Sequence, residues 1–273
     1  MSPLTMPRTL RTIGPIAARF FTAVFATASL LTAQSAGAAE KSTPQTEIEA
    51  GYSQEHLSNN SPDWRNIFVE GSHKFKDRNT LYGGLRETQR FGLKDNEVYG
   101  GLYYPLAATW TGIMDGNLSP THEVLARYGL GGQVQKILPY GLVAGVGFRH
   151  NEYTLSAANV RTFQLERYWG DFRGAYTLYS GKPEGGGSAP AHRFQFGYYY
   201  GDANSLGLAF TTGREVENIG PPKGLLATDV RSWSLAGRHW FARDWAMTYE
   251  ALTHRQGDLY RREGLRLGLR YRF

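Results

Sequence analysis

The sequence contains no cysteine among its 273 residues. This absence excludes disulfide bonds, thiolate metal sites and a lipid anchor on an N-terminal cysteine. Long apolar runs are also missing: the stretch Phe20–Leu31 does not reach the roughly 20 residues that a membrane-spanning helix needs, and no other stretch comes near that length. The mean hydropathy is −0.43. Backbone hydrogen bonds and side-chain packing must therefore hold the fold together.

The motifs of several enzyme and binding classes are absent from the sequence. No glycine-rich loop opens a helix, so no nucleotide cofactor is expected, and no basic arm suggests nucleic acid as a partner. The histidines show no metal-ligand spacing such as H-E-x-x-H, so no metal is expected. They are His56, His73, His122, His150, His192, His239 and His254.

Aromatic residues and glycine are abundant, with 17 Tyr, 14 Phe, 6 Trp and 33 Gly. Strands that alternate apolar and polar residues hide their hydrophobicity from a windowed average. A chain rich in aromatic residues but low in mean hydropathy is therefore compatible with a transmembrane β-barrel.

The N-terminus has the features of an export signal. Arg8, Arg11 and Arg19 precede the apolar run Phe20–Leu31, and Ala36–Ala38 fits the small-x-small rule for signal peptidase. We interpret residues 1–38 as a cleaved Sec signal peptide, with a membrane anchor as the alternative. Residues 39–45 would then form a short periplasmic leader and residues 46–273 an outer-membrane β-barrel. Cleavage would remove three arginines and no acidic residue, which lowers the formal charge from +6 to +3.

The rest of the chain consists of strand-like stretches with a period of two. They cover approximately residues 46–56, 63–76, 79–91, 96–106, 109–118, 123–137, 141–152, 158–169, 171–180, 191–201, 204–214, 226–241, 244–254 and 259–273. Short turns and longer loops alternate between them, and one of the longer loops is expected near residues 92–95. Arg167 shares the parity of Phe163 and Leu165, so the strand 158–169 is expected to end early or to carry a bulge.

The last ten residues show the alternation most clearly. Leu265, Leu267, Leu269, Tyr271 and Phe273 fall on one face of an extended chain, and Gly264, Arg266, Gly268, Arg270 and Arg272 fall on the other. This pattern is typical of the closing strand of an outer-membrane barrel, whose lipid face carries an aromatic residue at the interface. We predict an all-β, antiparallel up-and-down transmembrane barrel of about 14 strands (12–16), with both termini periplasmic, in the outer membrane of a Gram-negative bacterium.

Several blocks resemble a known family. Gly51–Ser53, Leu57–Asn59 and Pro62–Arg65 look like the opening of the YaiO-type outer-membrane β-barrel domain. Later blocks of that domain are similar to Arg90–Leu93, Arg167–Gly170 and Gly268–Phe273. The resemblance covers residues 46–273 and implies an outer-membrane location and a part in surface-polysaccharide export. Some members carry helical repeats before the barrel, so here a periplasmic export scaffold would be a separate protein.

One stretch suggests an enzyme. His56, Ser58 and Asn59 match the His-x-Ser-Asn stretch of barrel lipid A deacylases, in which a carboxylate orients a histidine that activates the serine. The alternative is that Ser58 and Asn59 only shape a tight connection. A protease-like rim site would draw on His122, Glu123 and Asp229 instead. We expect these residues to be structural and the protein not to be an enzyme.

The residues expected to line the lumen are rich in arginine and tyrosine. Arginine binds anionic groups bidentately, and tyrosine offers a ring face for sugars together with a hydroxyl. The set is Arg86, Tyr99, Tyr103, Arg127, Gln133, Gln135, Arg149, Arg173, Arg193, Gln195, Tyr199, Arg238, Arg266 and Arg270. It predicts either a conduit for an anionic or amine-bearing polysaccharide or an interior plugged by ion pairs.

The sequence leaves three functions open. The first is a porin-like channel or export component for a surface polysaccharide. The second is an outer-membrane hydrolase, and the third is a structural or adhesive barrel with a plugged lumen. The expected partners are outer-membrane lipid, the barrel-insertion machinery, the polysaccharide and a separate periplasmic scaffold.

The seam between the first and last strands should carry ion pairs. If both termini are periplasmic, the two strands pair antiparallel, and Glu47 and Glu49 lie opposite Arg272 and Arg270 on the lumen face. Cross-strand pairs of opposite charge contribute roughly 0.2–1 kcal/mol each. They would help fix the register, because a one-residue slip turns the arginines toward lipid.

The first prediction concerns the insertion signal, Tyr271 and Phe273. If the closing strand is recognised by the barrel-insertion machinery, as the resemblance implies, deletion of Phe273 should leave export intact and block insertion. Cell fractionation should then find the variant accumulated or degraded in the periplasm. Normal surface assembly of the variant would contradict this role of the last strand.

Overall fold

The structure is a computed structural model that describes residues 44–76, 79–201, 203–219 and 224–273. The predicted signal peptide, residues 1–38, and most of the predicted leader lie outside the described residues.

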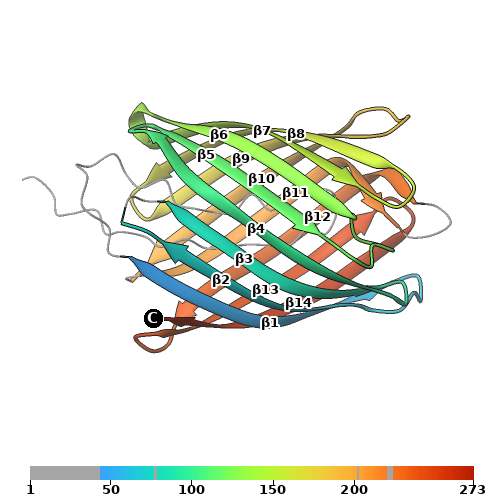
Figure 1. The fold of residues 1–273 in the computed structure, drawn as a ribbon, viewed down its shortest axis with the longest axis horizontal. Coiled ribbons are helices and arrows are strands. Elements are labelled where there is room, and N and C mark those ends of the chain that lie inside the picture. Colours follow the sequence, from blue (N-terminus) through green and yellow to red (C-terminus); the bar gives the residue numbers. More distant parts are fainter. Residues whose placement is uncertain (1–43, 77–78, 202, 220–223) are drawn as a thin grey trace, which may run out of the picture.

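The described chain forms one closed antiparallel barrel in which each strand pairs with its neighbours in sequence and β1 pairs with β14 (Figure 1). The strands are β1 Gln45–Leu57, β2 Trp64–Lys74, β3 Thr80–Arg90, β4 Leu93–Ala107, β5 Trp110–Leu118, β6 Tyr128–Leu138, β7 Leu142–Glu152, β8 Ala157–Trp169, β9 Phe172–Pro183, β10 Ala189–Tyr200, β11 Asn204–Asn218, β12 Leu225–Trp240, β13 Trp245–Gln256 and β14 Tyr260–Arg272. A short 3-10 helix, η1 Pro139–Gly141, connects β6 to β7. The prediction of an all-β barrel of about 14 strands is confirmed.

Burial in this barrel is the reverse of burial in a soluble protein. Along β14, Leu265, Leu267 and Leu269 point outward and are exposed, whereas Arg266 and Arg270 point inward and are buried. An exposed apolar outer face is what a lipid bilayer covers, and a polar interior is usual for outer-membrane barrels. Among the described residues, no helix has the length and apolar content that crossing a membrane requires.

The two ends of the barrel differ in their connections. One end, here called the terminus end, holds Gln45, Phe273 and the short connections β2–β3, β4–β5, β6–β7, β8–β9, β10–β11 and β12–β13 (Figure 1, left). The opposite end, here called the loop end, holds the seven other connections. The expectation of a longer loop near residues 92–95 is wrong. Phe91 and Gly92 form a two-residue turn with φ of 53° and 81°, because a hairpin with positive φ at both central residues needs no longer loop.

Two further expectations about strands are corrected. The strand expected from residue 123 begins at Tyr128, because the Asp95 carboxylate accepts hydrogen bonds from the backbone N–H groups of Glu123, Val124 and Leu125 and holds them in a loop. The expected bulge or early end in the strand 158–169 is also wrong. β8 pairs without a register shift with β7 and β9, and Arg167 simply lies on the exposed outer face.

The closed hydrogen-bond ladder predicts heat-modifiable migration on gels. A barrel without a free edge gives detergent no place to start unzipping strands. An unboiled sample in SDS should therefore migrate differently from a boiled sample. Identical mobility of the two samples, together with extraction of the protein by carbonate, would contradict a membrane barrel.

Candidate functional site

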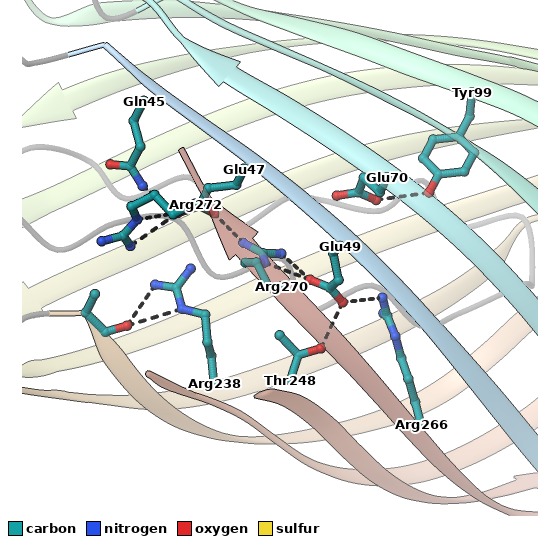
Figure 2. A network of polar contacts seen from close by, with 11 residues as sticks. Gln45, Glu47, Glu49, Glu70, Tyr99, Arg238, Thr248, Arg266, Arg270 and Arg272 are labelled. Atoms are coloured by element: carbon teal, nitrogen blue, oxygen red, sulfur yellow. Dashed lines mark hydrogen bonds and ion pairs between the residues drawn. The ribbon is translucent and has the colours of Figure 1, made fainter. Parts of the chain in front are cut away.

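The inner face at the β1–β14 seam carries a cluster of paired charges. Glu47 lies opposite Arg272 and Glu49 opposite Arg270 in the strand register. Nη1 of Arg270 donates to Glu47 Oε2 and Nε of Arg270 donates to Glu49 Oε2, both at 2.8 Å (Figure 2). Arg272 donates to Oε1 of Glu47 at 3.2 Å. The structure thus brings together the four residues that the sequence places on the seam.

The cluster extends along the inner wall to the neighbouring strands. Arg266 and Thr248 both donate to Glu49 Oε1, at 3.0 and 2.8 Å. On the other side of the seam the Tyr99 hydroxyl donates to Glu70 at 2.9 Å, as Figure 2 shows. Arg238, which is almost fully buried, donates to the Ala203 carbonyl at 2.9 Å. Each carboxylate of the seam accepts from more than one donor, which is the condition for keeping it charged inside the barrel.

Three other arginines of the inner wall pair with carboxylates. Arg86 pairs with Glu97, and Arg149 pairs with Asp115. Arg173 donates to Glu166 at 2.8 Å. The lining is therefore a mosaic of positive and negative groups and not a uniformly cationic surface.

The other residues predicted for the lumen lie on the inner face, with one exception. Gln133 donates to Gln164 at 2.9 Å. Tyr103 and Tyr199 are buried. By strand alternation Gln135, Arg193 and Gln195 also point inward. Arg127 does not belong to the lining: it is exposed and lies in the β5–β6 loop, because Asp95 holds this segment out of β6.

At the loop end, the hairpin of β11 and β12 leaves the barrel wall. The pairing of β10 with β11 stops at Ala191 and Gly213, whereas β11 and β12 stay paired up to Asn218 and Leu225. Glu215, Val216 and Glu217 are all buried, with exposures of 1%, 0% and 0%. In a wall strand every second residue would face outward, so burial of three successive residues means that this segment has protein on both sides.

The two faces of the hairpin contact opposite parts of the interior. Val216, together with Leu225 and Ala227, packs on a cluster of inward-facing residues of β8, β9 and β10. These residues are Ala158, Val160, Tyr179, Ala189 and Ala191. On the other face, the Tyr260 hydroxyl of β14 donates to Glu217 at 3.2 Å, and Arg90 of β3 lies 3.8 Å from Glu217. The hairpin therefore reaches across the lumen at its loop end.

The β5–β6 loop meets the hairpin. Val124, Leu125 and Ala126 are buried, and the carbonyl of Val124 accepts a hydrogen bond from the side chain of Asn218 at 3.2 Å. Tyr153 of the β7–β8 loop packs against the apolar face of the hairpin, and burial raises the pKa of its hydroxyl. The loop end of the lumen is thus occupied by chain segments that contact each other.

Sequence reasoning missed the residues that form this closure. Trp64 is fully buried under the guanidinium groups of Arg90 and Arg262, at 4.3 and 4.6 Å from its ring. Arg262 also pairs with Glu55 at 2.9 Å. One signal was available: alanine and valine occupy the inner face of β8–β10 near the loop end, where a water-filled lumen would favour polar side chains.

Among the described residues, no hydrogen bond joins the enzymatic candidates His56 and Ser58. The Asp63 carboxylate lies 3.0 Å from Nδ1 of His56, and hydrogen bonds from Gln54 and His56 hold the pKa of Asp63 below its usual range. However, Ser58 Oγ accepts from the backbone N–H of Arg261 at 2.9 Å, which fits its role as a loop residue. Nδ1 of His122 lies 3.2 Å from the Ser119 carbonyl. Within the described residues, no group of three or more His, Asp or Glu side chains could hold a metal ion.

Comparison with family models identifies the barrel. The model of the YaiO membrane beta barrel domain matches residues 45–218. The chain belongs to this family. The match spans β1–β11, and β12–β14 lie beyond it, so it is shorter than the expected resemblance over residues 46–273.

Solved outer-membrane barrels are similar to this chain at very low sequence identity. A bacterial polysaccharide outer membrane secretin has a TM-score of 0.50 at 11% identity, over 84% of this chain and 98% of that chain. OpdQ of Pseudomonas aeruginosa has a TM-score of 0.49 at 7% identity, over 84% and 98%. The KdgM porin in complex with disordered oligogalacturonate has a TM-score of 0.43 at 9% identity, over 82% and 98%. No curated protein matches the chain.

The seam predicts unequal effects of two arginine substitutions. Arg270→Ala removes a donor from both Glu47 and Glu49, which are buried. We expect it to lower the free energy of unfolding by about 3 kcal/mol, near the low end for a broken buried pair, because Arg266 and Arg272 remain. Arg272→Ala, the matched control, leaves Arg270 on Glu47 and should cost about 1 kcal/mol or less. Urea unfolding in detergent micelles measures both, and equal losses would contradict the central position of Arg270.

Proposed function

We propose that this YaiO-family barrel is an outer-membrane channel that passes a surface polysaccharide. The observation that carries the proposal is the combination of fourteen strands with a polar inner wall. Barrels of about eight strands are just filled by their own side chains, and those of 16 to 18 strands enclose an aqueous channel. A barrel of fourteen strands lies between these two sizes, so its lumen can hold a narrow channel beside the inward-facing side chains.

The lining supports a polysaccharide as cargo. Guanidinium and carboxylate groups alternate along the inner wall, and the side chains of Arg86 and Arg272 remain 24% and 26% exposed. Such groups offer hydrogen bonds to sugar hydroxyls and charge complements to acidic or amine-bearing sugars. Tyr99, which is only partly buried, adds aromatic surface to the wall, against which a sugar ring can pack. The polysaccharide secretin with the same fold motivates polysaccharide probes.

The differing connections support an orientation with both termini in the periplasm. Outer-membrane barrels have short periplasmic turns and longer outer loops. Five of the six connections at the terminus end contain two to four residues. The longest connection, residues 119–127, lies at the loop end. On this orientation the β11–β12 hairpin closes the outer mouth.

A plugged structural barrel is the second candidate, and one observation favours it. The hairpin and the β5–β6 loop contact each other across the loop end, through Asn218 and Val124. If these segments never move, the lumen admits no polymer. The conductance experiment separates the two candidates.

Purified protein in a planar bilayer tests the channel. We expect steady or repeated openings that are blocked from one side by oligogalacturonate, an acidic oligosaccharide, or by glucosamine oligomers, which carry amines. Neutral dextran oligomers of equal length are the control and should block at concentrations at least tenfold higher. Absence of openings, both in the intact protein and after shortening of the hairpin as described below, would establish the plugged barrel instead.

A further inference from the structure

We infer that residues 214–218 and 225–229, the described arms of the β11–β12 hairpin, form a gate that swings about Gly213 and opens the loop end of the lumen. This inference rests on the proposed channel function and adds its regulation. The arms stay hydrogen-bonded to each other from Arg214 and Asp229 to Asn218 and Leu225. The ladder to β10 has already ended at Gly213, so the pair can move as one unit.

Gly213 has the backbone conformation that a hinge at this point requires. Its φ is +130°, a value that residues with a side chain rarely adopt. A Cβ atom at this position would lie 2.4 Å from the Pro190 carbonyl oxygen and 2.7 Å from Cα of Ala191. The inward bend of β11 therefore depends on glycine, both for its backbone angle and for its close approach to β10.

Across the lumen the polar contacts of the hairpin are long, whereas near its base Gln256 donates to Thr228 and the Gly257 N–H donates to the Asp229 carbonyl at 2.6 Å. Tyr260 and Asn218 make hydrogen bonds of 3.2 Å, and Arg90 lies 3.8 Å from Glu217. These lengths are at or beyond the upper end for hydrogen bonds. The apolar face packs on one small cluster, which consists of Ala158, Val160, Tyr179, Ala189 and Ala191. The hairpin is thus tied firmly near its base, whereas beyond the base it is held by long polar contacts and one small apolar cluster.

The burial of Glu215 destabilises the closed position of the hairpin. Its carboxylate is buried, and Oε2 has no hydrogen-bond partner among the described residues. A buried polar atom without a hydrogen-bond partner is unfavourable, and hydration of that atom would remove this free-energy cost. Swinging the hairpin outward would hydrate Glu215 and Glu217 together, and this gain offsets the exposure of the small apolar patch on β8–β10.

A reversible disulfide tests the gate. A Cβ atom built on Gly181 of β9 lies 3.7 Å from Cβ of Val216, within the roughly 3.5–4.5 Å that a disulfide spans. Since the chain has no cysteine, the double variant Gly181→Cys/Val216→Cys can form no other disulfide within one molecule. We expect oxidation to lower the open probability in a planar bilayer at least tenfold, and dithiothreitol to restore it. The single variants Gly181→Cys and Val216→Cys, treated identically, should not respond.

A glycine pair on β11 provides the complementary test. Gly213→Ala should push the hairpin out of its closed position and raise the open probability severalfold. Gly207→Ala is the matched control, because a Cβ there meets its first neighbour, the Phe196 carbonyl oxygen, only at 3.5 Å. It should leave the open probability unchanged. Equal conductance of the two variants, with both folded as judged by heat-modifiable migration, would overturn the hinge.

The outcomes distinguish failure of the gate from failure of the channel. If oxidised and reduced double variants conduct equally, the gate is wrong and the channel stands. If neither conducts, a variant in which Asn-Gly replaces residues 215–227 decides. Conduction by this shortened variant would show that the hairpin is a fixed plug, and this result would overturn the gate. Silence of the shortened variant as well overturns the channel itself.

Discussion

The closure of the backbone hydrogen-bond ladder between β1 and β14 is the constraint on which the rest of the structure depends. Lipid supplies no hydrogen-bond partners, so an open edge would leave a row of unpaired N–H and C=O groups in the bilayer core. Eleven residue pairs, from Glu47↔Arg272 to Leu57↔Arg262, join the two strands. Closure also fixes the inner and outer faces of every strand, and the charges must follow it. Glu49 can meet Arg270 only because the register places both inside.

The same closure explains how much of the fold could be predicted from the sequence. A wall strand in lipid has one apolar and one polar face. Apolar and polar residues therefore alternate along its sequence, as in Leu265, Arg266 and Leu267. The seam register followed from this parity and from the antiparallel pairing. The β11–β12 hairpin escaped prediction because the strand was expected to end at residue 214, which left Glu215, Val216 and Glu217 outside any strand. Their burial depends on Arg90 and Tyr260, which are far away in the chain.

Local propensity also gave the wrong start for β6. Val124 and Ala126 share the parity expected of a strand, but the Asp95 carboxylate accepts from three successive N–H groups there. A buried carboxylate with three donors is well satisfied, and no pattern near residue 124 reveals a partner that lies on β4. Apart from the bulge expected at Arg167, the errors thus gather at the loop end, where contacts between distant segments replace the alternation that lipid imposes.

The chemistry of the closure suits a segment that has to exist in two states. An apolar plug would be stable inside the barrel and would pay the full hydrophobic penalty on exposure to water. A hairpin with Glu215 and Glu217 on one face and a small valine–alanine patch on the other is nearly balanced instead, because buried ion pairs gain little over hydrated charges. The seam shows the contrasting solution. Around Glu49, three donors at 2.8 to 3.0 Å leave no carboxylate oxygen without a partner, which suits a wall that stays closed.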